Sequence, residues 1–305
     1  MNTPLIHGWL VLDKPVGISS AKAIAIARRL FKTKKAGHTG TLDPAASGVL
    51  PIAFGEATKT IPFINNTNKS YEFSAFFGKS THTDDTEGEI LKTSPHRPTQ
   101  ADILTALPHF TGTIQQIPPA VSAIKIGGQR AYALTRSGKT PEMQPRSVTI
   151  QHLELREMPS PDEAIMAVDC TSGTYVRSLA RDLGHHLGTC AHAGNIRRTR
   201  SGGFSLNDTI SLEKLESMVH NAPSFEEVQR IVLPLTAPLD GIPVVRITEN
   251  EGARLKQGQT VRLHTPLPYD HASVTTVCAE YAGNAIALCA YQPPFLKPLR
   301  VFNLI

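Results

Sequence analysis

The first sixty residues alternate between short apolar runs and one stretch of helical spacing. Trp9–Leu12 and Val49–Phe54 are apolar runs of strand length, and the second is bounded by glycines, so both are typical of buried strands. Between them, Ser19 or Ser20 can cap a helix that continues to Phe31, because apolar residues recur there at intervals of three and four. The pattern predicts a strand, a helix and a second strand.

The middle of the chain contains further strand and helix patterns. Residues 69–78 alternate with Tyr71 and Phe73 on one face, which indicates a strand. Thr99 can cap a helix to about Phe110. The remaining predicted elements are a short helix at 56–64, strands at 147–158 and 164–171, a helix ending near 187, and two helices within 211–232.

The last part of the chain is rich in short strand-like runs. A cluster of proline and glycine at residues 234–243 is the best linker in the sequence. Beyond it, a short helix is expected near 249–256, followed by strand-like runs at 258–263, 273–281, 285–291 and 298–302. We therefore expect a large domain at 1–240 and a small β-barrel-like domain at 241–305.

One stretch, Gly37–Lys59, contains the best candidate for catalysis. Its acidic residue Asp43 lies between a glycine-rich turn and the apolar run. Pro44 favours an extended conformation at Asp43 and has a fixed φ angle of its own. The carboxylate is therefore held on a stiff loop, where catalytic groups are often found. The alternative is that Asp43 only caps a turn, as aspartate before proline commonly does.

Composition and charge narrow the class of protein. The chain has 305 residues, 40% of them hydrophobic and 19% charged, which is ordinary for a globular protein. No apolar run approaches the roughly 20 residues of a membrane span, and the start of the chain lacks a signal-peptide pattern, so we expect a cytoplasmic protein. Residues 1–60 hold eight Lys or Arg against three acidic residues, which matches the whole net charge of +5. Such a field attracts a polyanion, and a solvated basic helix face, which occurs often, is the alternative; charge alone favours nucleic acid only slightly.

Metal and disulfide signals are weak. The four cysteines include no C-x-x-C pair. His185, His186, Cys190 and His192 could be imagined as a zinc site, but their spacing fits no familiar ligand pattern. The polar segment 81–88, THTDDTEG, lacks the order of a calcium-binding loop. We expect neither a metal nor a cofactor.

Three separated motifs resemble the TruB family of tRNA pseudouridine synthases. They are DKPVGISS at 13–20, GHTGTLDPAASGVLP followed by GEATK within 37–59, and SGTYVRSL at 172–179. KSYEF at 69–73 is similar to the family's K-x-Y pattern. The resemblance covers residues 1 to about 240 and implies a mixed, largely antiparallel sheet flanked by helices, an α+β fold, with a PUA-like RNA-binding domain after it. The match over that last part is weak.

The resemblance also implies the roles of residues at the active site. It makes Asp43 the catalytic nucleophile and Arg177 its partner, a fixed charge that would keep the carboxylate ionised. Tyr71 would stack on the target base and help remove a proton, Tyr175 would contact the flipped nucleotide, and Ile196 would press against the base from the other side.

Other residues are expected to hold the RNA. His38 resembles the family residue that fills the space vacated by the flipped nucleotide, and Lys14 is a candidate supporting group beside the site. The basic segment 117–146 resembles the family's RNA-gripping thumb, with Lys125, Arg130, Arg136 and Lys139. Three arginines at a predicted strand edge are further candidates for phosphate contacts: Arg197, Arg198 and Arg200.

The implied activity is isomerisation of the T-loop uridine, position 55 of tRNA, by a monomer with no obligatory protein partner. A guide-RNA-dependent synthase of the related Cbf5 class shares the aspartate loop and is the first alternative. A tRNA-binding folding chaperone is the second, and a lyase or hydrolase that does not act on RNA is the third.

Overall fold

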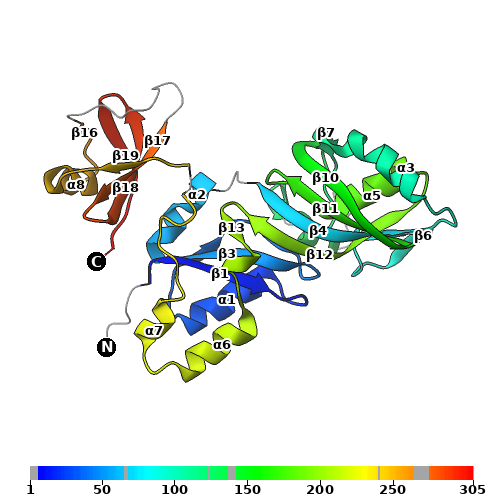
Figure 1. Ribbon diagram of the computed structural model, residues 1–305, viewed down its shortest axis with the longest axis horizontal. Coiled ribbons are helices and arrows are strands. Elements are labelled where there is room, and N and C mark those ends of the chain that lie inside the picture. Colours follow the sequence, from blue (N-terminus) through cyan, green and yellow to red (C-terminus); the bar gives the residue numbers. More distant parts are fainter. Residues whose placement is uncertain are drawn as a thin grey trace.

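The computed structural model describes residues 6–64, 68–122, 124–136, 142–239, 241–263 and 275–304. Its main feature is a ten-stranded mixed sheet with the order β14-β1-β3-β12-β4-β11-β10-β7, on which β13 pairs with β12 and β2 with β3 (Figure 1). The strands are β1 (Gly8–Lys14), β2 (Ala36–His38), β3 (Ser47–Phe54), β4 (Lys69–Phe77), β7 (Gly112–Gln116), β10 (Arg146–Ser160), β11 (Glu163–Cys170), β12 (Ala191–Ser201), β13 (Phe204–Ser205) and β14 (Ile210–Ser211).

Most pairs in this sheet are antiparallel. Among the described pairs of this sheet, only β1 with β14 and β3 with β12 are parallel. The mixed, largely antiparallel sheet with flanking helices, expected from the resemblance, is confirmed. Two short hairpins lie outside it: β5 (Lys79–Thr81) with β6 (Ile90–Thr93), and β8 (Lys125–Ile126) with β9 (Gln129–Arg130).

Helices cover one face of the main sheet, and both faces of β1 are buried. Leu10 and Leu12 join the core under the helices, whereas Trp9 and Val11 join a second core on the opposite face. This explains why β1 is apolar at consecutive positions instead of alternating. The helices are α1 (Ser20–Leu30), α3 (Gln100–Ala106), α5 (Val176–His186), α6 (Leu212–Asn221) and α7 (Phe225–Gln229) (Figure 1).

Helix predictions hold where a cap and apolar spacing agree. Ser19 caps α1 by accepting a hydrogen bond from Lys22 N at 3.2 Å. Two predicted helices instead break into shorter pieces. A 3₁₀ turn (Gly55–Lys59) precedes the short α2 (Ile61–Ile64), and α3 passes into a 3₁₀ turn (Leu107–Phe110). Pro62 and Pro108 have no N–H to continue an α-helical ladder, which explains both interruptions.

The C-terminal part forms a separate five-stranded sheet, ordered β15-β17-β18-β19-β16, that curls into a half-barrel (Figure 1). The small β-barrel-like unit predicted for this part of the chain is confirmed. Its elements are β15 (Val244–Arg246), α8 (Glu249–Lys256), β16 (Val261–Arg262), β17 (Thr276–Tyr281), β18 (Asn284–Gln292) and β19 (Phe295–Val301). The strand predicted to begin at Ser273 begins at Thr276, and residues 264–274 lie outside the described range.

The C-terminal sheet packs on the main one. Leu288 and Phe302 join the core around Trp9 and Val11. The Pro/Gly-rich segment predicted as a linker contributes to the same contact, because Trp9 Nε1 donates to Leu235 O at 3.2 Å. The described part of that segment is therefore packed against the core.

The segment predicted as a thumb is described only in part. Residues 131–136 form α4 (Ala131–Arg136), which follows the β8–β9 hairpin. Lys139 lies outside the described residues, as do the side chains of Lys125, Arg130 and Arg136. The thumb remains a prediction.

Candidate active site

Asp43 lies on the loop between β2 and β3, and this loop is tied down on both sides of the carboxylate. The Ser20 hydroxyl accepts from Leu42 N and donates to Leu42 O, both at 2.8 Å. The carbonyl of Pro44 accepts from Gly17 N at 2.9 Å and from Lys14 Nζ at 3.5 Å. The stiff loop inferred from glycine and proline is thus fixed further by the motif at 13–20.

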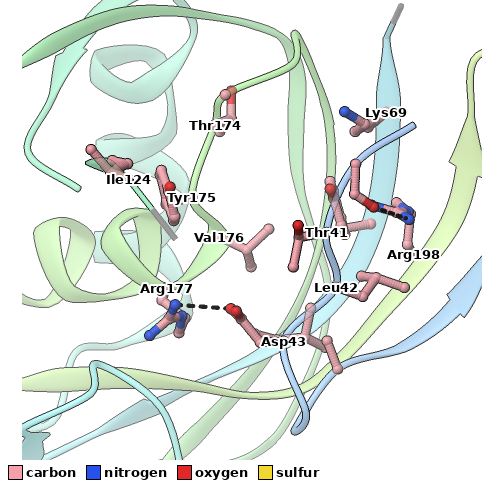
Figure 2. Close-up of a pocket in the computed structure, with 15 residues that line it drawn as sticks. Thr41, Leu42, Asp43, Lys69, Ile124, Thr174, Tyr175, Val176, Arg177 and Arg198 are labelled. Carbon is pink, nitrogen blue, oxygen red and sulfur yellow. Dashed lines mark hydrogen bonds and ion pairs between the residues drawn. The ribbon is translucent and has the colours of Figure 1, made fainter. Parts of the chain in front are cut away.

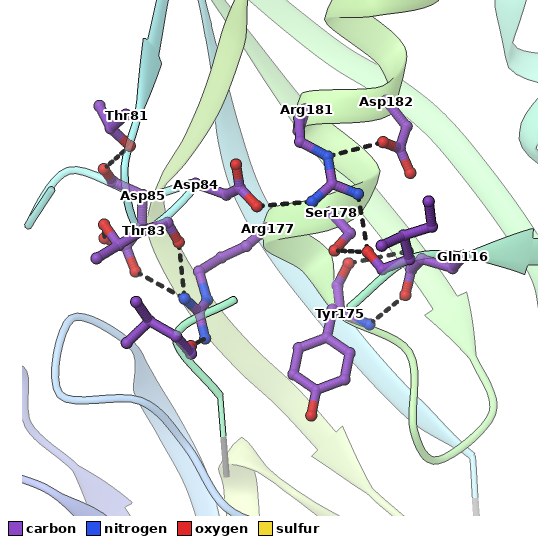
Figure 3. Close-up of polar contacts among 12 residues, drawn as sticks. Thr81, Thr83, Asp84, Asp85, Gln116, Tyr175, Arg177, Ser178, Arg181 and Asp182 are labelled. Atoms are coloured by element: carbon purple, nitrogen blue, oxygen red, sulfur yellow. Dashed lines mark hydrogen bonds and ion pairs between the residues drawn. The ribbon is translucent and has the colours of Figure 1, made fainter. Parts of the chain in front are cut away.

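Arg177 reaches Asp43 from the first turn of α5. Its Nη2 lies 2.9 Å from Asp43 Oδ2, and its Nη1 lies 3.5 Å from Asp85 Oδ2 (Figures 2 and 3). The guanidinium also donates to the carbonyls of Thr83, at 2.7 Å, and Val121, at 3.0 Å. The Arg177 side chain is only 4% exposed, whereas the Asp43 side chain is 40% exposed. The arginine is therefore a buried fixed charge, and the carboxylate it holds remains accessible to a ligand.

Asp85 was missed by the sequence analysis. It lies in the polar segment 81–88, its side chain is 4% exposed, and it faces Nη1 of Arg177, whereas Asp43 faces Nη2. The next arginine on α5, Arg181, is bound in the same way by Asp84, at 2.7 Å, and by Asp182, at 2.9 Å (Figure 3). Two adjacent acidic residues in that segment were the available signal, but only the fold shows which cations they face.

A cavity of about 300 Å³ opens beside Asp43. The predicted residues Tyr71, Tyr175, Arg177 and Ile196 all line it together with Asp43. Figure 2 labels Asp43, Tyr175 and Arg177 among the lining residues. Tyr71 and Ile196 are buried on the adjacent strands β4 and β12. With Arg198, the structure thus brings six sequence-predicted residues to one cavity.

The two tyrosines of the cavity are held differently. Burial raises the pKa of the Tyr71 hydroxyl, so this group stays protonated at neutral pH. The backbone of Tyr175 is held by Gln116, another residue the sequence analysis missed. Gln116 Nε2 donates to Tyr175 O at 3.0 Å, and Gln116 Oε1 accepts from Tyr175 N at 2.8 Å (Figure 3).

Two predicted residues lie near the cavity without lining it. Lys14 is fully buried, and its Nζ donates to the carbonyls of Pro15 and Ile18, both at 2.8 Å. Burial lowers the pKa of Lys14 to about 8. His38 lies on β2, where its Nδ1 accepts from Gly40 N at 3.3 Å, and burial lowers its pKa. Lys14 supports the backbone of the Asp43 loop, and His38 is neutral at pH 7.

The strand-edge position predicted for the three arginines is wrong. They lie on β12, which runs between β3 and β4 inside the sheet. Arg198 is fully buried and donates to Val49 O at 2.7 Å and Gly40 O at 3.2 Å. The prediction that Arg198 contacts phosphate at the protein surface is therefore wrong, because only the side of its guanidinium that faces the cavity could reach a ligand. Arg197 pairs with Asp13 at 2.8 Å, and Arg200 is exposed.

Lys69 also lines the cavity, although the sequence analysis gave it no role. It is 8% exposed, and its Nζ donates to Ser172 Oγ at 2.8 Å. Burial, and secondarily the charge of Arg198, lower its pKa from 10.5 to about 8. Burial of the Lys69 ammonium group destabilises the folded state.

Replacing Lys69 by methionine should therefore stabilise the protein near neutral pH. Between about pH 8 and 10.5 the unfolded chain holds the Lys69 proton and the folded protein does not, so this lysine makes stability rise with pH across that window. We expect Lys69→Met to raise the free energy of unfolding at pH 7 by about 2 to 3 kcal/mol. Urea unfolding of both proteins should show this difference shrinking toward pH 10. A difference in unfolding free energy that does not change with pH would contradict a lowered pKa for Lys69.

No cluster of three or more potential metal-ligating side chains occurs among the described residues. His192 stacks on Phe76, and His186 packs against His109 and Phe110. The four cysteines are free and buried. No helix in the described ranges is long and apolar enough to span a membrane.

Family models and solved structures identify the class of protein. Residues 28–176 match the TruB family pseudouridylate synthase (N terminal domain), and residues 177–240 match the tRNA pseudouridylate synthase B C-terminal domain. A chain in the structure of an H/ACA RNP bound to a substrate RNA containing 2′-deoxyuridine has a TM-score of 0.73 at 22% identity, covering 97% of this chain and 85% of that one. A chain in the archaeal box H/ACA sRNP Nop10-Cbf5 complex has a TM-score of 0.72 at 21% identity, covering 98% and 87%. These two likenesses show the shared fold, and the family models define the chain as a pseudouridylate synthase.

Sequence relatives specify which kind of pseudouridylate synthase this chain is similar to. The chain is 48% identical over 301 residues to the tRNA pseudouridine synthase B of Bradyrhizobium diazoefficiens, covering 98% of this chain and 86% of the relative. It is 42% identical over 307 residues to that of Caulobacter vibrioides, covering 98% and 97%. The chain belongs to the TruB family.

Proposed function

We propose that this enzyme isomerises uridine 55 in the T-loop of tRNA to pseudouridine. The observation that carries the proposal is Asp43, held by a buried arginine at the wall of a cavity of about 300 Å³, a volume suited to one nucleotide. The relatives named tRNA pseudouridine synthase B support tRNA as the substrate.

The reaction breaks the C1′–N1 bond of uridine, turns the uracil and forms a C1′–C5 bond. The C5 proton is lost and N1 gains a proton, so the change is an isomerisation without net oxidation. Asp43 is the nucleophile, attacking either uracil C6 or ribose C1′, and Arg177 keeps it ionised and oriented. Tyr71 and Ile196 hold the detached base in the cavity. The Tyr71 hydroxyl is protonated, so it assists removal of the C5 proton as a relay, donating its own proton as it accepts the one from C5.

Binding requires the target uridine to leave its stack, at a cost of a few kcal/mol. We propose that His38 enters the space the uridine leaves, while the segment 117–146, Arg197 and Arg200 contact phosphates. Residues 1–240 act as the catalytic domain, and residues 241–305 act as a PUA-like RNA-binding domain. The enzyme works in the cytoplasm as a monomer without an obligatory partner.

Purified protein incubated with an unmodified tRNA transcript should convert uridine 55 alone. The expected product is detected by position-resolved mapping of pseudouridine, with no other macromolecule added. A transcript carrying cytidine at position 55 is the matched control and should gain no pseudouridine. Conversion at another position would contradict the assigned target.

The fold shared with chains of H/ACA complexes keeps a guide-dependent synthase as the second candidate. The relatives at 48% and 42% identity are named for tRNA as their substrate, which favours the first candidate. Product that forms only after guide RNA and partner proteins are added would overturn the first proposal in favour of the second.

A further inference from the structure

Lys69 and Arg198 bring two buried positive charges to the same part of the cavity wall. Lys69 Nζ donates to Ser172 Oγ, and no described carboxylate is among the groups that act on its charge. Arg198 uses Nε and Nη2 on backbone carbonyls, and its guanidinium also interacts with the Tyr71 hydroxyl, while its Nη1 has no direct hydrogen bond in the described part of the chain. Both residues line the cavity, and both are more than nine-tenths buried.

Gly40 shows how closely the two cationic groups converge. A Cβ atom at this position would lie 3.0 Å from Lys69 Nζ and 3.6 Å from Arg198 Nη1. Its φ of +140° is also one that side chains disfavour. The absence of a side chain at Gly40 therefore leaves both groups room at this part of the wall.

The cavity is electrically polarised. At the Asp43 end, one arginine faces the carboxylates of Asp43 and Asp85, whereas the other end holds Lys69 and Arg198 (Figure 2). A neutral base alone would leave the second end positively charged and shielded from water, which is costly. A permanent anion would be repelled by Asp43 and attracted to the opposite end.

We propose that Lys69 and Arg198 bind one of the two phosphates that flank the target uridine. This assignment rests on the proposed function, because the phosphate belongs to the RNA substrate. The Lys69 ammonium and the Arg198 Nη1 supply donors to the non-bridging oxygens, as charge-assisted hydrogen bonds. The phosphate at one end of the cavity and Asp43 at the other then set where the ribose between them lies.

The test combines a protein change with a substrate change. T-arm RNA hairpins are prepared with a neutral methylphosphonate in place of either flanking phosphate, and pseudouridine formation is compared for wild type and Lys69→Met. In the wild type, one of the two neutral linkages should lower kcat/KM about ten- to thirtyfold. On the native hairpin, the kcat/KM of Lys69→Met should be lower than that of the wild type by a similar factor. Replacing the sensitive phosphate by methylphosphonate should then lower the kcat/KM of this variant by less than about threefold further.

Lys79→Met is the matched control, because Lys79 is an exposed lysine on β5 outside the cavity described above. It should show the wild-type response to both neutral linkages. Urea unfolding checks that Lys69→Met is folded. Equal fold-losses in wild type and Lys69→Met at both linkages would overturn the phosphate site and point to contact with the uracil instead. Full activity of Lys69→Met would also overturn it. If the wild type makes no pseudouridine on the native hairpin, the proposed function itself fails.

Discussion

Replacing Asp43 by asparagine should abolish pseudouridine formation, lowering the single-turnover rate by about 10⁵-fold or more. The amide is nearly the same size and can still accept a hydrogen bond from Arg177, but it cannot act as the nucleophile. Because the Asp43 side chain is 40% exposed, its replacement should change stability little. The rate is measured with tRNA transcript and enzyme in excess, so that weakened binding does not mask the chemistry.

The same variant separates an enzyme from an RNA chaperone. Asp43→Asn should bind tRNA about as tightly as the wild type, because the phosphate contacts proposed here come from other residues. A chaperone would keep its whole effect on RNA folding after this change. Retention of more than a few per cent of the wild-type rate would show that Asp43 is not the nucleophile.

Replacing Arg177 by methionine should damage both stability and turnover. Asp85, whose side chain is 4% exposed, would lose the cation that faces it, so we expect the free energy of unfolding to fall by about 3 kcal/mol. The Asp43 carboxylate would lose its fixed partner and its orientation, and we expect the rate to fall by about 10³-fold. Urea unfolding and single-turnover kinetics measure the two effects separately.

A double variant tells the two roles of Arg177 apart. Adding Asp85→Asn removes the unpaired buried charge, while an asparagine can still accept the hydrogen bonds that Thr83 Oγ1 and Glu87 N donate to Asp85. Arg177→Met/Asp85→Asn should therefore regain most of the lost stability and none of the lost rate. If the rate returned together with the stability, Arg177 would be a structural residue only.

Local signals in the sequence were sufficient for the elements around Asp43. The run at 9–12, the Ser19 cap and the run at 49–54 became β1, α1 and β3, because cap, spacing and burial agree at each. The resemblance added Arg177, which is 134 positions from Asp43 in the chain and 2.9 Å away in space. No periodicity could have paired residues so distant in the chain.

Residues whose surroundings are set by strand order were missed or misjudged. Arg198 belongs to a run of arginines typical of a surface, yet β12 runs between β3 and β4, and the arginine is fully buried. Lys69 begins β4, and only the order of the strands in the sheet brings it close to Arg198. Asp85 required the contact between its loop and α5. These positions depend on tertiary pairing, which no local pattern encodes.

The most direct measurement is a crystal structure of the Asp43→Asn variant bound to a T-arm RNA. Uridine 55 should be extruded into the cavity between Tyr71 and Ile196, with the residue 43 side chain about 3 to 3.5 Å from uracil C6 or ribose C1′. Arg177 should still contact residue 43 in that complex. A target base outside the cavity, or an Arg177 side chain turned away from residue 43, would contradict the roles proposed for Asp43 and Arg177.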